Sequence, residues 1–395
     1  MEIFPIKLSD PIHWSLPPSK SHMIRWLMLA FQSKNDVIIK FDGTPGDDIM
    51  SAVYCLNILG LEVEDNKSYW KIFGEKKTNK GSKIILNCGN SGTTVNFLTA
   101  ITSMMNKEVT IEGDESLKKR DFSHLNKGLR KLGCDISGDS PPYTILGPIT
   151  KKRVELGIDI SSQPLSAIIL SSPTHNGEII IDTIGKSVSS EYGDLTIEIA
   201  EKCGIKITRN KDEIIVNAAH LELPDVVEIP SESSLIPIAI LLSELHDVEL
   251  ILSNNNKNKF LDSGIDILKS KGLEKINLSD YSDMITPAAV LLAITGGGEI
   301  TGVKHARGKE SDRIENTKNL IEDFGMECEV IGDELKIPGY QKPQKPQKSV
   351  ETYDDHRIAM TAIVLATLTG ANIINPEISS VTDPEFLDKI NNIII

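Results

Sequence analysis

The chain has 395 residues and carries 42 Lys and Arg against 56 Asp and Glu, which gives a formal net charge of −14. With 25% charged and 40% hydrophobic residues it has the composition of a globular protein, which excludes disordered and fibrous chains. The acidic balance argues against general binding to a nucleic-acid backbone, which requires basic surface. A small anionic ligand is still compatible with it, because a cleft can concentrate a few cations locally. The length predicts two or three domains.

The sequence gives no signal for a membrane span, for secretion or for disulfides. It has no run of about 18 apolar residues. Residues 1–7, MEIFPIK, lack the basic start and apolar core of a secretory signal. The cysteines are few and far apart, with no CxxC pair, and they are Cys55, Cys88, Cys134, Cys203 and Cys328. We therefore expect a cytoplasmic protein with free thiols and no cysteine metal site.

A weak internal repeat runs along the chain. In each copy an apolar helix end is followed by a glycine and then by a short alternating strand, as in residues 56–63. The glycines fall at positions 60, 133, 204, 272 and 325, and residues 386–390 resemble a sixth copy without its glycine. Each glycine suits the position just after a helix, where the backbone becomes left-handed. Helix–glycine–strand is common in any α/β protein, but its recurrence favours copies of one α/β unit.

Several apolar stretches rich in small residues are expected to form buried helices. They are residues 23–31, 94–104, 165–172, 234–245, 288–294 and 359–368. Residues 341–348, QKPQKPQK, are polar and contain proline, which predicts an exposed loop.

Residues 17–25, PPSKSHMIR, place polar residues at the start of the first apolar helix. Ser19 can cap this helix, and Lys20, Ser21 and Arg25 then lie on or just before its first turns. A helix N-terminus that carries Lys and Ser is suited to an anion. The simpler alternative is a capped helix with surface cations. We favour ligand binding because Arg25 borders a buried apolar run.

Three further segments are weak signals when each is taken alone. Residues 87–94, NCGNSGTT, form a loop of small residues whose backbone N–H groups can bind phosphate or carboxylate. Arg120 ends a run of three cations, and a guanidinium can bind a carboxylate through two hydrogen bonds. Residues 161–163, SSQ, offer two hydroxyls and an amide before an apolar helix. An ordinary strand-to-helix turn, an exposed cationic run and a helix cap would look the same.

Two charged motifs lie in the last third of the chain. Residues 307–313, RGKESDR, place Glu310 beside Lys309 and Arg313, which makes it a candidate for proton transfer. A salt-bridged helix start is the alternative. Residues 354–357, DDHR, put Arg357 at the start of an apolar helix, again a position suited to an anion.

Taken together, the motifs SKSxxxR, GNSGT, KESDR and DHR in this order resemble those of the 5-enolpyruvylshikimate-3-phosphate (EPSP) synthase family of enolpyruvyl transferases. The resemblance extends from Lys20 to Arg357. It implies an α/β fold of the α+β type: a two-domain inside-out α/β barrel, with three βαβαββ repeats in each domain and a double-crossover hinge. The domains would be residues 1–18 plus 230–395 and residues 19–229, with the active site in the cleft between them.

The resemblance also implies a reaction and its residues. The enolpyruvyl group of phosphoenolpyruvate would move to the 5-hydroxyl of shikimate 3-phosphate with release of phosphate, in the shikimate pathway to chorismate and the aromatic amino acids. Addition and elimination through a tetrahedral intermediate would need no metal or other cofactor. The catalytic residues would be Lys20 and Glu310, with Thr286 at the position of the family's aspartate. Shikimate 3-phosphate would contact Lys20, Ser21, Arg25, Ser161, Ser162, Gln163, Ser189 and Lys309. Phosphoenolpyruvate would contact Lys20, Gly92, Arg120, Gln163, Arg313 and Arg357.

Four positions depart from the family pattern. Asn96 stands where the family usually has Arg, and Ser231 begins a segment that is usually Asp-Ala-Ser. Thr286 replaces the usual general base for the 5-hydroxyl, and Val381 replaces a Lys near the C-terminus. These changes affect proton transfer more than binding, and the loss of an acid–base group costs about 10²–10⁴-fold in rate. Candidates to replace the missing base are Asp280, Asp283 and Glu310.

The departures leave two alternatives, a carboxyvinyltransferase with another acceptor and a catalytically impaired anion-binding protein. A UDP-N-acetylglucosamine enolpyruvyl transferase is disfavoured because Lys20 is followed by Ser21, not Asn, and no Cys lies between Cys88 and Arg120. The RNA 3′-phosphate cyclases, which share the repeat unit, are disfavoured by the charge of −14. We expect small anionic substrates as partners, no nucleic acid, no membrane and a monomeric chain.

Overall fold

The structure is a computed structural model that describes residues 1–74, 83–175, 177–218, 220–253 and 275–394. The chain forms two compact units. Unit 1 contains residues 1–18, 42–46 and 230–395, and unit 2 contains residues 19–41 and 47–229. Segment 42–46 falls in unit 1 because it packs there: a Cβ on Gly46 would lie 2.7 Å from the carbonyl oxygen of Val381. The chain thus passes between the units at four points.

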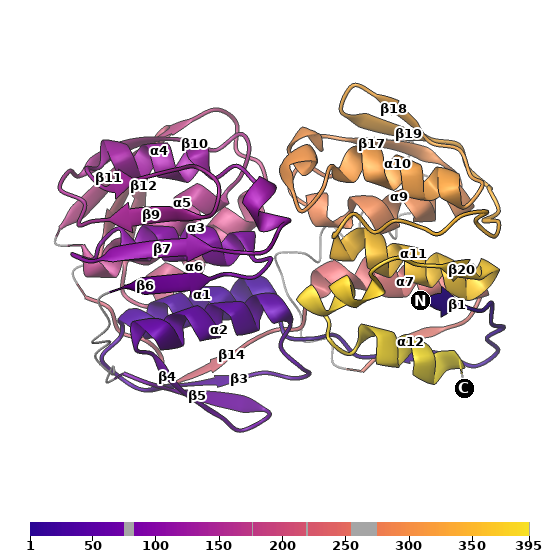
Figure 1. Cartoon of the computed structure of the whole chain (residues 1–395), viewed down its shortest axis with the longest axis horizontal. Helices are drawn as coiled ribbons and strands as arrows, with labels where there is room; N and C mark the ends of the chain where they lie inside the picture. Colours follow the sequence, from indigo (N-terminus) through magenta and orange to yellow (C-terminus); the bar gives the residue numbers. More distant parts are fainter. Residues whose placement is uncertain (75–82, 176, 219, 254–274, 395) are drawn as a thin grey trace. The chain divides into compact units, whose positions relative to one another are not determined.

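Unit 2 contains three four-stranded sheets built to one plan (Figure 1). Their strands are β3 (Val37–Lys40), β4 (Glu62–Asp65), β5 (Tyr69–Phe73), β6 (Ile84–Asn87), β7 (Glu108–Glu112), β8 (Asp135–Ile136), β9 (Tyr143–Leu146), β10 (Arg153–Gly157), β11 (Glu178–Ile184), β12 (Lys206–Arg209), β13 (Glu213–Asn217) and β14 (Val226–Glu228). The spatial orders are β14-β3-β5-β4, β6-β7-β9-β8 and β10-β11-β13-β12. In each sheet the first pair is parallel and the other pairs are antiparallel.

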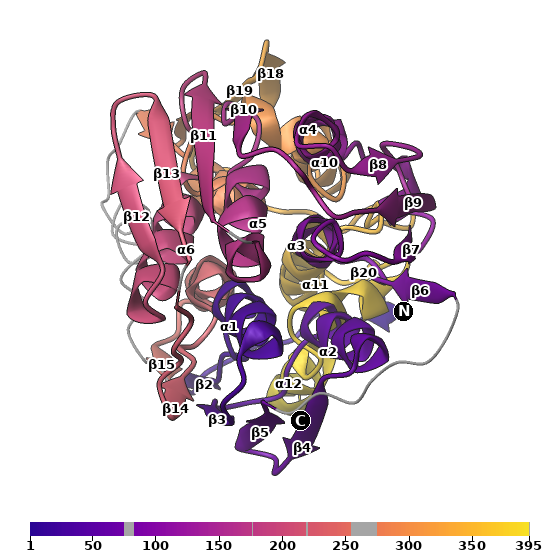
Figure 2. The same ribbon diagram turned by 90° about the vertical axis from the view of Figure 1, so that its left-hand side faces the viewer.

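Six α-helices are described in unit 2, of which one joins β6 to β7 and another joins β10 to β11, the crossovers that these parallel pairs require. They are α1 (Lys20–Gln32), α2 (Asp47–Leu59), α3 (Gly92–Thr102), α4 (Ser123–Lys131), α5 (Gln163–Ser171) and α6 (Ser190–Lys202). Helices α1, α3 and α5 pack against one another, and Figure 2 shows them inside the three sheets. All nine residues from Met23 to Phe31 are buried, as expected of a helix enclosed on every side. Apart from Arg25 these residues are apolar, because the helix is enclosed and does not bury a single face only.

Unit 1 repeats the plan in the sheet β16-β17-β19-β18, in which the β16–β17 pair is parallel. Two smaller pairings, β15 with β2 and β1 with β20, complete its described strands. The strands are β1 (Glu2–Ile3), β2 (Ile12–Trp14), β15 (Leu250–Leu252), β16 (Lys275–Asn277), β17 (Gly298–Thr301), β18 (Glu329–Ile331), β19 (Glu334–Ile337) and β20 (Ala371–Asn372). The helices are α7 (Ile236–His246), α9 (Ile285–Ile294), α10 (Arg313–Asp323), α11 (His356–Thr369) and α12 (Phe386–Ile394). Helices α7, α9 and α11 pack together, and α11 is buried from His356 to Thr367.

The repeat glycines lie where the sequence places them. Gly60, Gly133, Gly204 and Gly325 follow α2, α4, α6 and α10, and their φ angles are between 69° and 111°. A side chain is disfavoured in this left-handed region, so glycine ends each helix at low cost. The fourth copy of the repeat, with Gly272, lies outside the described residues. The mixed α/β class and the recurrence of one unit are confirmed.

Candidate active site

The first turns of α1 carry two cations in different environments. Lys20 Nζ lies 3.0 Å from Asp48 Oδ2, and both side chains are largely buried. Arg25 is 2% exposed, and its guanidinium donates to Thr196 Oγ1 at 2.7 Å and to the carbonyl oxygens of Ser21 and Tyr192. Among the described residues all three acceptors are neutral. Burial lowers the pKa of Arg25 to about 10, which leaves it charged at neutral pH.

The Arg120 guanidinium lies against the N-terminal end of α3. Ser91 Oγ caps the helix by accepting from the Thr94 backbone N–H. Arg120 Nη2 donates to Asn90 Oδ1 at 2.6 Å, and a Cβ on Gly92 would come within 3.2 Å of Arg120 Nη1. The glycine therefore lets the guanidinium lie against the start of the helix. The structure brings Gly92 and Arg120 together across 28 residues of sequence.

The N-terminal ends of α5 and α6 supply the predicted uncharged groups. Ser161 Oγ accepts from the Gln163 backbone N–H at 3.1 Å, and Ser162 is buried. Gln163 reaches α3, where its amide contacts Thr93 Oγ1 and Asn96. Ser189 precedes α6 with a φ of 50°, a left-handed backbone that is unusual for serine. Backbone strain of this kind is concentrated at ligand sites.

Helices α1, α3, α5 and α6 thus hold their predicted ligand residues at their N-terminal ends. Contacts across the helices join these ends, since Arg25 of α1 bonds residues of α6, and Gln163 of α5 bonds residues of α3. Helix N-termini carry partial positive charge and N–H groups without helical partners. We call this set the unit 2 cluster: Lys20, Arg25, Gly92, Arg120 and Gln163.

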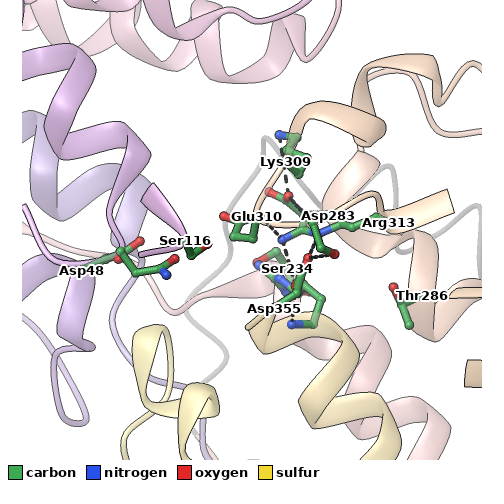
Figure 3. Close-up of polar contacts among 12 residues, drawn as sticks. Asp48, Ser116, Ser234, Asp283, Thr286, Lys309, Glu310, Arg313 and Asp355 are labelled. Atoms are coloured by element: carbon green, nitrogen blue, oxygen red, sulfur yellow. Dashed lines mark hydrogen bonds and ion pairs between the residues drawn. The ribbon is translucent and has the colours of Figure 1, made fainter. Parts of the chain in front are cut away.

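A second cluster surrounds Arg313 in unit 1 (Figure 3). Arg313 Nε donates to Asp355 Oδ2 at 2.8 Å, Nη1 donates to Asp283 Oδ1 at 2.6 Å, and Nη2 donates to Glu310. Lys309 Nζ lies 3.7 Å from Asp283 Oδ1. Burial alone would lower the pKa of Arg313, but the carboxylates of Asp355, Glu310 and Asp283 raise it well above its ordinary value. The unit 1 cluster is therefore Asp283, Lys309, Glu310, Arg313 and Asp355, with a permanently charged guanidinium at its centre.

Arg357 lies in the first turn of α11. It follows Asp355 of the unit 1 cluster by two residues, and its backbone contacts the Asp355 side chain. Asp355 caps α11 by accepting from the Arg357 backbone N–H at 2.9 Å. The Arg357 guanidinium donates to the Ser234 carbonyl oxygen at 2.8 Å and to Ser234 Oγ at 2.6 Å. It is 2% exposed, and Nε has no hydrogen-bond partner in the described part of the chain. Arg357 is thus a buried cation whose direct side-chain acceptors in that part are neutral.

The structure does not bring Thr286 into the unit 1 cluster. Thr286 is 1% exposed in the first turn of α9, and its hydroxyl shares a 2.9 Å hydrogen bond with that of Thr317. Figure 3 shows no dashed line from Thr286 to the cluster residues. Asp283, one helical turn earlier, is the residue that contacts Arg313. The carboxylate at this end of α9 is therefore supplied by Asp283.

The other departures are accommodated without a cation. Val381 is 5% exposed at the end of the short helix Pro376–Val381, packed as an apolar residue. Ser231 is buried and forms an isolated bridge with Pro18. Its neighbour Glu232 accepts from Ser234 Oγ at 2.6 Å, so a carboxylate lies behind the serine that contacts Arg357.

Three residues that contact the cations Lys20, Arg313 and Arg357 were not singled out as ligand or catalytic residues from the sequence. Asp48 and Ser234 follow no charged motif, and the signal for Asp48 is its place in the first turn of α2. Asp355 lies within the DDHR motif, where its position directly before an apolar helix marks it as a helix cap. Its second role, binding Arg313 42 residues away, leaves no trace in the local sequence.

The fold and the two clusters define a two-unit α/β protein with buried and partly buried cations at helix N-termini, positions that are suited to small anions. The model of the EPSP synthase (3-phosphoshikimate 1-carboxyvinyltransferase) family matches residues 13–235 and 237–390. The chain belongs to this family of enzymes. It contains no helix in its described residues that is long and apolar enough to cross a membrane.

Curated relatives and solved structures agree with the family match. A 3-phosphoshikimate 1-carboxyvinyltransferase of Saccharolobus islandicus is 28% identical over 409 residues, covering 98% of this chain and 96% of that protein. The protein of the same name from Methanococcus maripaludis is 28% identical over 416 residues, covering 96% and 95%. A solved EPSP synthase from Acinetobacter baumannii has a TM-score of 0.78 at 21% identity and covers 99% of this chain and 97% of that one. This structural likeness confirms the two-domain α/β fold expected from the sequence.

Proposed function

We propose that the protein transfers the enolpyruvyl group of phosphoenolpyruvate to the 5-hydroxyl of shikimate 3-phosphate and releases phosphate. The chain belongs to this family, and the observation that carries the proposal is that each unit contains a buried arginine without a carboxylate acceptor in the described residues. These arginines are Arg25 in unit 2 and Arg357 in unit 1. Each is buried, and in the described residues each guanidinium meets neutral acceptors. A buried charge is costly without a partner of opposite sign, so both positions favour an anionic ligand.

The unit 2 cluster supplies groups for shikimate 3-phosphate. Lys20, Ser21 and Arg25 would contact this substrate from α1, and Lys309 would add a cation from unit 1. The hydroxyls that precede α5 and α6 would hold its phosphate and ring. The residues proposed for this second role are Ser161, Ser162, Gln163 and Ser189.

Phosphoenolpyruvate would be bound by arginines from both units. Arg120 lies against Gly92 at the start of α3, so a bound anion would meet both a guanidinium and helix N–H groups. Arg313 and Arg357 would contribute from unit 1, with Lys20 and Gln163 shared between the substrates. Each unit holds only part of this set.

The chemistry needs two groups that move protons. In the addition step the 5-hydroxyl oxygen bonds to C2 of phosphoenolpyruvate, its proton goes to a base, and C3 gains a proton. In the elimination step the bond from C2 to the phosphate oxygen breaks and C3 loses a proton. We assign the C3 proton to Glu310 and the hydroxyl proton to Asp283, whose carboxylate faces Arg313 and Lys309. Lys20 would stabilise the charge on the transferred group.

The position of Asp283 argues against the alternative that the chain is a catalytically impaired anion-binding protein. That alternative depends on Thr286 at the position of the base, and a carboxylate one turn earlier can take the same role. We also propose that the protein is monomeric and that it is located in the cytoplasm. Gel filtration with light scattering and fractionation of the source cells would test these two.

The decisive experiment is turnover with defined substrates. Purified protein is incubated with phosphoenolpyruvate and shikimate 3-phosphate, phosphate release is followed, and the enol ether product is identified by NMR. Parallel reactions omit the acceptor or replace it with shikimate or UDP-N-acetylglucosamine. Release only with shikimate 3-phosphate supports the proposal. Release with another acceptor would mean that the substrate is wrong, and ligand binding without release would support the binding-protein alternative.

A further inference from the structure

Asn96 joins the two helices whose N-terminal ends hold Gly92 and Gln163. It lies in the second turn of α3 and is 6% exposed. Its Nδ2 donates to the Gly92 carbonyl oxygen at 3.0 Å and to Gln163 Oε1 at 2.7 Å. Gln163 is the first residue of α5. Gln163 Nε2 in turn donates to Thr93 Oγ1 at 3.2 Å. Three side chains and one backbone carbonyl thus form a short chain of hydrogen bonds.

The Gly92 carbonyl sets the direction of this chain. A backbone carbonyl can only accept, so the end of the Asn96 amide that faces it must be the NH₂ group. The second hydrogen of that NH₂ points to Gln163, and the atom that receives it must also be an acceptor. Oε1 of Gln163 therefore faces Asn96, and Nε2 faces the first turn of α3.

We propose that Asn96 is a positioning residue for phosphoenolpyruvate, because it holds the Gln163 amide with its donor toward the anion. The Gln163 NH₂ carries two hydrogens, and the contact with Thr93 accounts for one. The other is a donor at the N-terminal ends of α3 and α5, where helix N–H groups also favour an anion. With the opposite orientation, Oε1 would meet the anion and repel it.

The inference rests on the proposed function, since it takes Gln163 to be a ligand of phosphoenolpyruvate. It also explains how a neutral Asn serves where the family usually has Arg. Asn96 is neutral and adds no charge, but it occupies the acceptor end of the Gln163 amide, so that only the donor end is left for the anion. This pocket would therefore bind its anion through oriented dipoles in place of one guanidinium.

The test is a double-mutant cycle with Asn96→Leu, Gln163→Leu and both together, since leucine is close to both amides in size. The dissociation constant of phosphoenolpyruvate is measured by calorimetry with a saturating analogue of shikimate 3-phosphate that lacks the reacting 5-hydroxyl, so that no turnover occurs, beside KM and kcat with both substrates. We expect each single variant to raise the dissociation constant about tenfold, the effect of one hydrogen bond to a charged group. The double variant should be no weaker than Gln163→Leu, because Asn96 acts through Gln163.

Two further variants separate positioning from stability and charge. Asn126→Leu is the matched control, since Asn126 is a fully buried amide of the same unit whose Nδ2 donates to the Gly138 carbonyl. It should lower the melting temperature but leave phosphoenolpyruvate affinity unchanged. Asn96→Asp keeps the size and reverses the Gln163 amide, so it should weaken binding more in the wild-type background than in Gln163→Leu, where only the added charge acts.

The outcomes are distinct. Unchanged affinity in Asn96→Leu, or additive losses in the double variant, would overturn the positioning role while wild-type turnover left the proposed function intact. Equal effects of Asn96→Asp in both backgrounds would also overturn it. A wild-type protein that bound phosphoenolpyruvate without turnover would remove the proposed reaction, and the cycle would still decide the role of Asn96. No binding by the wild type would remove both.

Discussion

Arg313 Nη1 donates a 2.6 Å hydrogen bond to Asp283 Oδ1 in unit 1. This contact places a carboxylate among Arg313, Lys309 and Glu310, where the proposed reaction needs a base. We predict that Asp283→Asn lowers kcat about 10²–10⁴-fold, because the amide cannot accept the hydroxyl proton. Steady-state phosphate release gives the rate.

Thr286 provides the matched control for Asp283. Its hydroxyl bonds Thr317 and contacts no member of the unit 1 cluster, so Thr286→Val should change kcat by less than about threefold. Thr286→Asp should lower the free energy of unfolding, because it would bury an unpaired carboxylate. A larger loss of kcat in Thr286→Val than in Asp283→Asn would show that residue 286, and not Asp283, takes part in the proton transfer.

Arg357→Gln should weaken phosphoenolpyruvate binding by about 2–5 kcal/mol. The reason is that a buried guanidinium whose direct hydrogen-bond acceptors are neutral contributes its charge to the ligand. Calorimetric titration measures the loss. Arg153→Gln is the control, since the Arg153 side chain is 56% exposed and binds Asp182 and Glu213 on the surface. Equal dissociation constants for Arg357→Gln and the wild type would remove Arg357 from the site.

Gly92→Ala should raise the KM for phosphoenolpyruvate about tenfold without loss of stability. The new Cβ would lie 3.2 Å from Arg120 Nη1, so the guanidinium at the start of α3 must shift by a few tenths of an ångström. Gly92 does not have a positive φ, so alanine adds no backbone strain there. Gly296→Ala is the comparison, because its Cβ would meet nothing within 4 Å. If both variants keep the wild-type KM, the position of Arg120 does not affect binding.

His22 should make the protein less stable in mild acid. Burial, helped by the charges of Arg25 and Lys202, lowers the pKa of His22 to about 3 from 6.5. As the pH falls below about 6.5 the unfolded chain is protonated first, so the free energy of unfolding decreases toward pH 3 by at most about 1.4 kcal/mol per pH unit. Above pH 6.5 the term is constant.

Urea unfolding of the wild type and His22→Gln at pH 7, 6, 5 and 4 isolates this term, since other titrating groups are common to both proteins. The variant should lose less stability between pH 6 and pH 4. Parallel pH dependences would show that His22 is accessible to protons in the folded state.

Much of this site could be predicted from the sequence because its chemistry lies at helix starts. Ser19-Lys20-Ser21 and Asp355-His356-Arg357 are polar residues at the caps and first turns of buried helices, and this pattern is local. The repeat was visible for the same reason, since Gly60 and Gly325 end helices whose backbone requires a left-handed residue. Arg25 was predicted to border a buried face and is itself buried.

The tertiary structure decided which residues meet. From the sequence, Asp280, Asp283 and Glu310 were all candidates to replace the base missing at Thr286, because the motif does not show which carboxylates face Arg313. Asn96 stands 67 residues from Gln163, and a deficit of positive charge was all that the sequence indicated there. Hydrogen bonds depend on distance and direction between atoms, and packing of separate helices sets both. The sequence alone determined the family, the repeat and the helix starts, and the folded chain determined the partners.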